Sequence, residues 1–410
     1  MAYVHPRDYP STEVNALQAI QMAAALSEIT DLEFFIPKTY QKAKNLKKKY
    51  DVGESLKIKS MNFQLVPDFI LKDIPDYFEK AVAANVQMKA EWRDPSKMKV
   101  LFVRDPKELL YWARQKKENP FFRDWVFVFE GHSTIGLLPN KEGSNPVFIA
   151  ESEDEKRYAT EVMECLKAFD IVLCVTQSLA NALQLWTNGE VIPYLIRHAS
   201  PLSRVEQPPE IKFGEKIILG YAGQISQYKG VNVIFEALRY LPGMFEVRIF
   251  GGFHKRNSNR DWIDLYKQDS LLSNRIEIRD AVPIGQVAQE IDSCDILIQP
   301  ASTDIRNTNF EAPLKSFDYM VRGKPIIIAD VPCHRELYRD GENGLLYDTT
   351  AEDLAKKILT LASNPNLASK IACGAWDQSV EYDYLVRANK ILSQIVHSCW
   401  NSSNRTSSGL

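Results

Sequence analysis

Charged side chains crowd the segment 310–328, FEAPLKSFDYMVRGKPIII, directly before an apolar run that is typical of a buried strand. A helix that begins near Pro313 or Leu314 would present free N–H groups and a partial positive charge, to which Lys315 adds a full charge. This combination is typical of a phosphate site. Asp318 could accept hydrogen bonds from the vicinal hydroxyls of a ribose, or it could be an acidic residue that the helix dipole favours. Glu311 is equally consistent with a ligand of sugar hydroxyls and with an ordinary loop carboxylate.

A second phosphate candidate follows the apolar run IILGYAG, in the segment QISQYKG. Gly223 and Gly230 permit close approach of a ligand to the backbone, and Lys229 supplies a point charge suited to phosphate. Taken alone, the pattern is equally consistent with a glycine turn that carries a solvated lysine. Like the first segment, however, it lies directly after a predicted strand.

The first half of the chain has polar residues at two comparable positions. The run VFVFEGHST ends in Glu130, His132 and Ser133, where a histidine could meet a substrate, although a lone histidine is more often structural. The loop HPRDYPSTEVN leads from a short first strand into a helix that begins at about Thr12 or Glu13, and it is a second candidate pocket. Its serine and threonine are also consistent with helix caps.

All four segments depend on a fold that places strand ends together. From residue 216 onward, short apolar runs alternate with helical patterns, which predicts a parallel sheet wrapped by helices. One helical stripe, at i, i+3, i+4 and i+7, consists of Ile234, Ala237, Leu238 and Leu241. The first half repeats this alternation less cleanly. Ligands of open parallel sheets bind beyond the carboxyl ends of the strands, where these four segments lie.

Chain length and composition favour two α/β domains. The 410 residues exceed what a single core usually holds, and the segment 196–215, rich in Pro and Ser, predicts a linker. We therefore predict an N-terminal domain over residues 1–200 and a C-terminal domain over residues 216–380. Residues 381–400 continue a helical pattern with one apolar face, which must pack on another element.

Composition and missing motifs exclude several classes of protein. A net charge of −3 offers no field for polyanions, so nucleic acid is not expected as a partner. Six cysteines, far apart, predict reduced thiols in a cytoplasmic protein without a signal peptide or membrane span. The lysine cluster KTYQKAKNLKKKY is typical of a solvated helix face, and a weak membrane-surface contact is its alternative. Dinucleotide-binding, phosphate-loop ATPase, serine-hydrolase and zinc-protease motifs are missing.

Together, these stretches resemble family 4 of the retaining glycosyltransferases, which have the GT-B fold. The segment GYAGQISQYKGVNVIFEAL is similar to the family's donor-phosphate loop, PLKSFDYMVRGKPIII to its PLKLFEYMAAGKPVV block, and VPCHRELYRDGENGLLYD to the stretch that follows. The resemblance implies two facing Rossmann-like domains with parallel sheets. It also implies that the last helix crosses back to the first domain.

Residue roles follow from the resemblance by position. Lys229 would bind the donor diphosphate with help from Lys315, Asp318 would hold the ribose, and His132 would lie beside the reacting sugar. The predicted catalytic residues are His132, Lys229 and Glu311. The predicted donor-binding residues are Gly223, Gln224, Lys229, Arg279, Val282, Glu311, Ala312, Pro313, Leu314, Lys315 and Asp318. The predicted acceptor-side residues are Ser11, Thr12, Asn15 and Ser133.

Two departures from the family pattern concern the donor site. Many members carry arginine where Gln224 stands, so one contact to the diphosphate is an amide here or comes from elsewhere. Many members also show two glutamates separated by seven residues, whereas Glu311 and Asp318 are separated by six. Asp318 aligns with the second acidic position of the family pattern, whereas Glu311 departs from the family spacing.

The sequence thus predicts an enzyme that moves a sugar from a nucleotide-sugar to a sugar, lipid-linked or small-molecule acceptor. The resemblance implies retention of anomeric configuration without a cofactor, and no Asp-x-Asp metal motif stands in a strand-end loop. Two alternatives stay open: a sugar-nucleotide 2-epimerase, and a non-catalytic protein that binds nucleotide-sugar or glycan.

Overall fold

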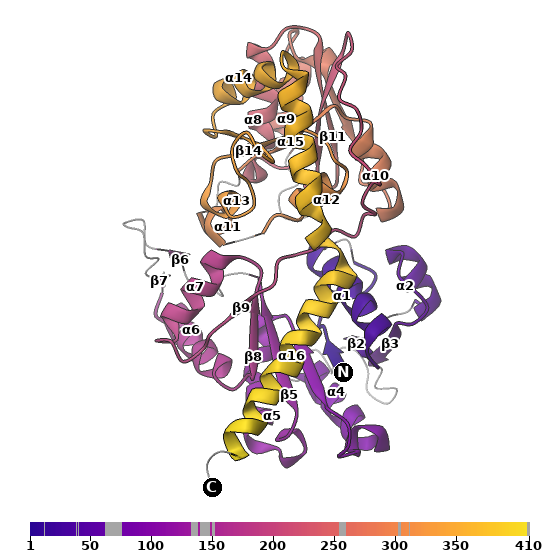
Figure 1. Ribbon diagram of the computed structural model, residues 1–410, viewed down its shortest axis with the longest axis vertical. Helices are drawn as coiled ribbons and strands as arrows, with labels where there is room; N and C mark the ends of the chain where they lie inside the picture. Colours follow the sequence, from indigo (N-terminus) through magenta and orange to yellow (C-terminus); the bar gives the residue numbers. More distant parts are fainter. Residues whose placement is uncertain are drawn as a thin grey trace. The chain divides into compact units, whose positions relative to one another are not determined.

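The chain divides into two compact units in a computed structural model (Figure 1). The first unit combines Met1–Arg197 with Tyr384–Leu410, and the second unit is His198–Asp383. The residues that the structure describes are 1–11, 13–37, 39, 41–61, 76–132, 138–139, 148–149, 152–253, 260–301, 305–310 and 312–407.

A seven-stranded sheet forms the centre of the first unit, in the order β3-β2-β1-β4-β5-β8-β9. All of its neighbouring strands are parallel. Its strands are β1 (Ala2–Val4), β2 (Glu33–Pro37), β3 (Lys57–Met61), β4 (Val100–Val103), β5 (Val126–Gly131), β8 (Ile171–Cys174) and β9 (Tyr194–Leu195). A short antiparallel pair consists of β6 (Leu138–Pro139) and β7 (Phe148–Ile149).

Helices surround this sheet because its central strands are apolar on both faces. The sequence VLFV of β4 is buried throughout, as is required of a strand covered on both sides. The helices are α1 (Val14–Ile29), α2 (Ala43–Tyr50), α4 (Tyr77–Met88), α5 (Pro106–Glu118), α6 (Glu153–Leu166), α7 (Gln177–Trp186) and α16 (Tyr384–Ser407).

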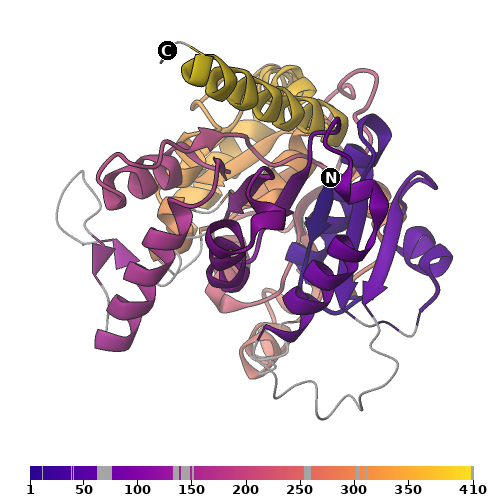
Figure 2. The ribbon, with the colours of Figure 1, turned by 90° about the horizontal axis from the view of Figure 1, so that it is seen from below.

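The C-terminal helix α16 packs on the first unit, alongside α1 (Figure 2). Its residues Ala388, Ile391 and Ile395 are fully buried, at the spacing of one helix face. Because this stripe needs an apolar partner, the helix extends the core of the unit to which residues 1–197 belong.

The second unit contains a six-stranded parallel sheet in the order β12-β11-β10-β13-β14-β15. Its strands are β10 (Ile217–Ala222), β11 (Phe245–Phe250), β12 (Ile276–Arg279), β13 (Ile296–Gln299), β14 (Ile326–Ala329) and β15 (Leu345–Tyr347). Its helices are α8 (Val231–Ala237), α9 (Asp261–Gln268), α10 (Ile284–Asp292), α11 (Ile305–Phe310), α12 (Leu314–Val321), α13 (Pro332–Arg335), α14 (Ala351–Ala362) and α15 (Pro365–Gln378).

Two hydrophobic clusters cover the two faces of this second sheet. Alternate residues of β10 belong to different clusters: Leu219 and Tyr221 pack with α8 and α14, whereas Ala222 packs with α10, α12 and α15. Strands β10 and β11 pair along their whole length, from Ile217 opposite Phe245 to Ala222 opposite Phe250. The loops that follow them therefore leave the sheet at the same edge.

Both sheets confirm the predicted class of two parallel-sheet α/β domains. Among the helices of the described residues, none has the length and hydropathy needed to cross a bilayer.

Candidate functional site

The connection order of the second sheet reverses between its neighbouring strands β10 and β13. The chain moves outward on one side from β10 to β12 and on the other side from β13 to β15. Crevices at such reversals, beyond the carboxyl ends of the strands, are where open α/β sheets bind ligands. The loops after β10 and β13 are therefore the expected binding region of this unit.

Lys315 lies against Gly223 at this reversal. A Cβ atom built on Gly223 would stand only 3.1 Å from Cε and 3.7 Å from Nζ of Lys315. The Nζ atom also lies 4.9 Å from the centre of the Tyr221 ring. Two predicted donor-binding residues from distant parts of the sequence, Gly223 in the loop after β10 and Lys315 in the first turn of α12, are thus in contact.

Backbones approach one another closely in the loops that follow β10, β11 and β13. A Cβ atom on Gly251, which follows β11 and has a φ of 152°, would overlap the carbonyl oxygen of Gly223. A Cβ atom on Gly230, with a φ of 74°, would overlap the carbonyl oxygen of Ala301 after β13. Glycine is required at both positions because only it adopts these conformations without a clash. Three strand-end loops therefore meet in a narrow space.

Lys229 ends a short 3₁₀ turn, Gln227–Lys229, on the same loop as Gly223. The hydroxyl of Ser226 caps this turn by accepting a hydrogen bond from the backbone N–H of Lys229 at 3.2 Å. The Lys229 Nζ atom lies 5.1 Å from the centre of the Tyr228 ring. Gln224, where family members often have arginine, accepts a hydrogen bond from the Tyr221 hydroxyl through its backbone carbonyl at 2.8 Å.

Helix α12 begins at Leu314, after Pro313 in an extended conformation with a φ of −69°. Pro313 makes no side-chain cap to this N-terminus, whose partial positive charge suits an anion. Ala312 and Leu314 pack against the core beneath and anchor the start of the helix. Glu311, predicted to contact the sugar, lies outside the described residues.

Asp318 is one turn into α12, and its Oδ1 accepts a hydrogen bond from the Ser200 hydroxyl at 2.6 Å. Burial raises the pKa of this carboxyl to about 6, against the opposing effects of the Ser200 hydrogen bond and of Lys315. The carboxylate form still prevails at neutral pH and can accept hydrogen bonds from hydroxyls. Ser200 was not predicted, because a serine in a Pro- and Ser-rich linker carries no signal.

A buried chain of hydrogen bonds links the ends of β13 and β14 to helices α12 and α13. His334 approaches the Ala329 carbonyl through Nδ1 at 2.7 Å and the Gln299 side-chain nitrogen through Nε2 at 3.3 Å. Ser316 donates to the oxygen of the same Gln299 amide at 3.4 Å. Burial lowers the pKa of His334 to about 4, so the ring is neutral and can donate from Nδ1 while it accepts at Nε2. No pattern in the sequence predicts this chain.

Arg279, predicted to lie near the base, pairs with acidic neighbours at the end of β12. Its Nε donates to Glu277 at 2.7 Å and its Nη1 to Glu290 at 2.6 Å. The guanidinium therefore stabilises the strand end, and Val282 lies in the loop that follows, partly buried. Because the Arg279 side chain is engaged in these two contacts, the backbone of this loop is the candidate contact to a base.

In the first unit, the strand order reverses between β1 and β4, and a buried polar cluster occupies that edge. Glu130, at the end of β5, is fully buried between two arginines. Arg387 of α16 donates from Nη2 to Glu130 Oε1 at 2.9 Å, and Arg104 Nη2 lies 3.6 Å from the same oxygen. Arg104 follows β4 and also donates to Gln18 of α1 at 3.0 Å.

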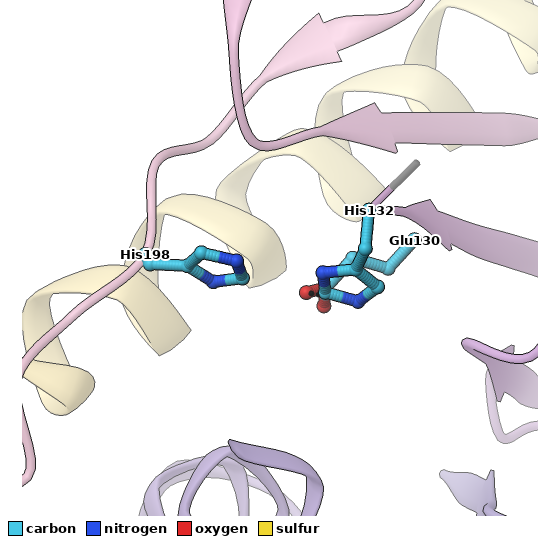
Figure 3. Close-up of side chains that lie close together, drawn as sticks. All are labelled: Glu130, His132 and His198. Carbon is cyan, nitrogen blue, oxygen red and sulfur yellow. Dashed lines mark ion pairs between the residues drawn. The ribbon is translucent and has the colours of Figure 1, made fainter. Parts of the chain in front are cut away.

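His132 lies beside this cluster, with its ring next to the Glu130 carboxylate (Figure 3). Its Nε2 atom is 2.8 Å from Arg104 Nε and 3.2 Å from Glu130 Oε1. Burial, followed by the charges of Arg104 and Arg387, holds the pKa of this imidazole well below its ordinary value. His132 is therefore a neutral ring at the edge where a ligand of the first unit is expected.

The remaining predicted residues of the first unit have mixed outcomes. Ser11 accepts from the backbone N–H of Glu13 at 3.0 Å, which is a local turn contact. The backbone carbonyl of Asn15 accepts from Arg104 Nη1 at 3.4 Å, so Asn15 adjoins the polar cluster. Thr12 and Ser133 lie outside the described residues. Arg104 was not predicted, although it ends the apolar run MKVLFVR and the rule that found His132 applies to it equally.

A family model described as Glycosyl transferases group 1 matches residues 203–375, which comprise most of the second unit. The chain also resembles solved structures over nearly its whole length. Sucrose-phosphate synthase from Thermosynechococcus elongatus is 15% identical with a TM-score of 0.72, and the alignment covers 98% of this chain and 99% of that one. A comparison with curated proteins gave no match.

Two further structures are similar in the same way. HepE of Anabaena, solved in complex with UDP-glucose, is 16% identical with a TM-score of 0.66, over 97% of this chain and 99% of that one. A glycosyltransferase from Rickettsia africae is 17% identical with a TM-score of 0.60, and the alignment covers 97% of this chain and 98% of that one. At these identities the likeness concerns the fold. The predicted GT-B fold of two Rossmann-like units is thereby confirmed.

Proposed function

We propose that the protein transfers a sugar from a nucleotide-sugar to an acceptor, as a family 4 glycosyltransferase that retains the anomeric configuration. The observation that carries the proposal is the approach of Lys315 to Gly223 where the strand order of the second unit reverses. It joins a cation, a backbone turn and the N-terminus of α12 at the position where open parallel sheets bind ligands. The match of residues 203–375 to a glycosyltransferase model supports the same assignment.

In the proposed reaction, the bond between the anomeric carbon and the donor phosphate breaks. Negative charge develops on the leaving diphosphate and oxocarbenium character on the sugar. Lys229, Lys315 and the N-terminus of α12 stabilise the diphosphate as a preorganised electrostatic site. The acceptor oxygen attacks from the face that the phosphate leaves, and the phosphate takes its proton. This scheme needs neither a nucleophilic side chain nor a metal ion.

The other predicted residues would bind and orient the two substrates. Asp318 would hold the ribose, and the loop after Arg279 would contact the base. His132 would adjoin the reacting sugar from the first unit, where a sugar, a lipid-linked sugar or a small molecule would be the acceptor. UDP-sugars are the first donors to test, because HepE was solved with UDP and with UDP-glucose. All six cysteines are free thiols, which favours a cytoplasmic location.

The proposal is tested first by ligand-induced stabilisation. A ligand at 100 times its dissociation constant stabilises the folded protein by about 2.7 kcal/mol, which raises the melting temperature. We expect one of UDP-, GDP- or ADP-glucose to raise it, and Lys315→Ala to remove most of the rise. Lys212→Ala is the control, because Lys212 is an exposed lysine paired with Glu210 in the same unit. If no nucleotide-sugar stabilises the protein, the assignment of the donor site is wrong.

The second step identifies the reaction with the donor that binds. Release of nucleotide that depends on an acceptor, and that persists in EDTA, is the expected result. Conversion of the donor without any acceptor would instead reveal a sugar-nucleotide 2-epimerase. Tight binding without turnover on a broad acceptor panel would favour a non-catalytic binding protein. Loss of turnover in EDTA with recovery in Mg²⁺ or Mn²⁺ would refute the metal-free scheme.

A further inference from the structure

Ser200 connects three segments of the second unit through its side chain and its backbone. Its hydroxyl donates to Asp318 Oδ1 at 2.6 Å, and its backbone N–H donates to the Tyr382 carbonyl at 2.8 Å. A parallel bridge also pairs Ser200 with Asp383. Ser200 is therefore held between helix α12 and the last residues of the unit.

The direction of the hydrogen bond from Ser200 to Asp318 follows from a second contact. The backbone N–H of Leu202 donates to Ser200 Oγ at 3.0 Å and so occupies a lone pair of that oxygen. A hydroxyl carries a single proton, and an ionised carboxylate has only acceptor atoms. The Ser200 proton is therefore directed at Asp318. Water has little access to this bond, because Ser200 is only 4% exposed.

The second oxygen of the Asp318 carboxylate has a different environment. Asp318 is partly exposed, and none of the residues that the structure describes donates a hydrogen bond to its Oδ2. Asp318 follows Lys315 by three residues, so both side chains lie on the same face of α12. Lys315 in turn contacts Gly223 where the strand order reverses. Oδ2 is thus the oxygen that remains for a ligand bound at this reversal.

Two aromatic contacts hold α12 in place. The Tyr319 hydroxyl accepts a hydrogen bond from the backbone N–H of Ala222, at the end of β10, at 2.8 Å. The Phe317 ring packs edge-on against the ring of Tyr382, with 4.8 Å between their centres. Because the backbone of the helix is fixed by these contacts, its carboxylate can move only by rotation of the side chain, which Ser200 restricts.

We propose that Ser200 is a positioning residue of the donor site and that it sets the preference of this site for ribonucleotides. It holds Asp318 through Oδ1, so that Oδ2 accepts hydrogen bonds from hydroxyls of the ribose. A 2′-deoxyribose lacks one of these donors, and a site built to bind a hydroxyl disfavours the analogue without it. This role rests on the proposed function, whereas the contact between the two side chains does not.

Binding of a ribonucleotide and of its 2′-deoxy analogue to the full chain tests the preference. The probes are UDP, GDP and ADP, of which the tightest binder is compared with its 2′-deoxy form by isothermal titration calorimetry. We expect the wild type to bind the 2′-deoxy form about 10- to 100-fold more weakly, as for one hydrogen bond to a charged group. In Ser200→Ala the ratio of the two dissociation constants should approach one. A wild-type ratio near one, or an unchanged ratio in Ser200→Ala, would overturn the proposal.

Ser379→Ala is the matched control. Ser379 is also a buried serine of this unit, which accepts from Arg204 Nε at 3.0 Å and donates to the Trp376 carbonyl at 2.7 Å. It joins the same two stretches of chain as Ser200, but among the described residues its partners do not include Asp318. We expect Ser379→Ala to keep the wild-type preference for ribose. Loss of the preference in this variant would overturn the assignment to Ser200.

Two further variants separate the hydroxyl from the volume of the side chain. Ser200→Thr keeps a hydroxyl and should retain the preference, whereas Ser200→Cys, whose thiol is a weak donor, should lose most of it. Ser200→Cys also replaces Ser200→Ala if that variant does not fold, and full preference in a folded Ser200→Cys protein would overturn the proposal. With the identified donor, Ser200→Ala should raise KM more than it lowers kcat, because the ribose contact exists before and during the reaction. A lower kcat at unchanged KM would contradict this role.

The contact itself is tested without a nucleotide, through the titration of Asp318. The hydrogen bond from Ser200 lowers the pKa of this carboxyl, as does Lys315, against the larger effect of burial. In protein labelled with ¹³C at the aspartate carboxyls, the signal lost in Asp318→Asn identifies the group. Ser200→Ala should raise its pKa above the wild-type value of about 6, and an unchanged pKa would refute the contact. If the pKa rises but no nucleoside diphosphate binds, the proposed function is wrong and the role toward ribose is refuted with it.

Discussion

Arg387 of α16 and Glu130 of β5 form a buried ion pair inside the first unit, with Nη2 and Oε1 separated by 2.9 Å. Arg104 Nη2 lies 3.6 Å from the same carboxylate oxygen, so two guanidinium groups share one carboxylate. Among these three groups, Glu130 carries the one negative charge, and it offsets both positive charges. The stability of the unit should depend more on Glu130 than on either arginine.

The first prediction follows from this asymmetry. Glu130→Gln leaves two buried guanidinium groups without a counter-charge and should reduce the free energy of unfolding by about 3–5 kcal/mol. Arg387→Met should cost less, because Glu130 keeps Arg104. Urea-induced unfolding, monitored by circular dichroism, measures both. Glu352→Gln, which removes the partner of the exposed Lys356 on α14, is the control and should leave the midpoint unchanged. Equal effects of Glu130→Gln and Glu352→Gln would contradict the burial argument.

The second prediction concerns the two lysines of the proposed donor site. Removal of one hydrogen-bond donor to a developing oxyanion typically costs about 10²–10³ in rate, so Lys229→Ala should lose turnover on this order. Lys315→Ala should lose less, because the N-terminus of α12 remains. If both contact one diphosphate, the double variant should lose less than the product of the single effects. Steady-state kinetics with the identified donor checks this. Wild-type turnover by a folded Lys229→Ala protein would refute the phosphate role.

The third prediction uses the raised pKa of Asp318. The pKa of this carboxyl is about 6 in the folded protein and 3.8 in the unfolded chain, so the folded protein holds the proton more tightly. Stability from this group is therefore present below about pH 4 and lost as the pH rises toward 6. Asp318→Asn should gain stability relative to the wild type over that interval. The gain should reach at most about 1.4 kcal/mol for each pH unit that separates the folded pKa from the unfolded pKa.

Melting temperatures between pH 4 and pH 7 measure the effect of Asp318→Asn. Asp348→Asn is the control, because hydrogen bonds from Thr350 lower the pKa of that exposed carboxyl. Its stability contribution is lost only as the pH falls below the unfolded value of 3.8, so over this range Asp348→Asn should differ from the wild type by a nearly constant amount while Asp318→Asn gains stability. Parallel slopes would show that Asp318 titrates normally. Asp318→Asn should also weaken binding of the nucleotide, since the ribose contact exists throughout the reaction.

The fourth prediction separates backbone strain from steric overlap at the donor loops. Gly230→Ala and Gly189→Ala place a side chain at similar φ angles, 74° and 79°. Only at Gly230 would the new Cβ atom overlap another residue, the carbonyl oxygen of Ala301. Gly189→Ala should therefore cost about 1–2 kcal/mol for the left-handed conformation alone. Gly230→Ala should cost more and should also reduce the melting-temperature rise caused by the donor. Equal losses of unfolding free energy in the two variants would mean that the loop after β13 moves to accommodate the new Cβ atom without cost.

The fold and the donor loops were accessible from the sequence because both depend on local order along the chain. Alternation of apolar runs with helical stripes predicts the parallel sheets, and the strand-end rule finds Lys229 and Lys315 directly. The same rule fits Arg104, which follows β4 as His132 follows β5. Its role was not predicted because an arginine after a strand is usually solvated.

Other residues of the candidate sites depend on partners that no local pattern discloses. Arg387 lies in an amphipathic helix, where arginine normally marks the exposed face, and only its contact with Glu130 explains its burial. Ser200 donates to Asp318 over a separation of 118 residues. Such pairs are defined by tertiary structure, so composition and spacing cannot predict them.

The discontinuity of the first unit has a consequence for biosynthesis. Helix α16 completes the core around α1, yet Tyr384–Ser407 leaves the ribosome only after the entire second unit has been made. The second unit is continuous in sequence, so it can fold while it emerges, whereas the first waits with Glu130 unpaired by Arg387 and one face of α1 uncovered. Chaperones that bind exposed apolar segments would therefore act on residues 1–197 for longer than on the second unit.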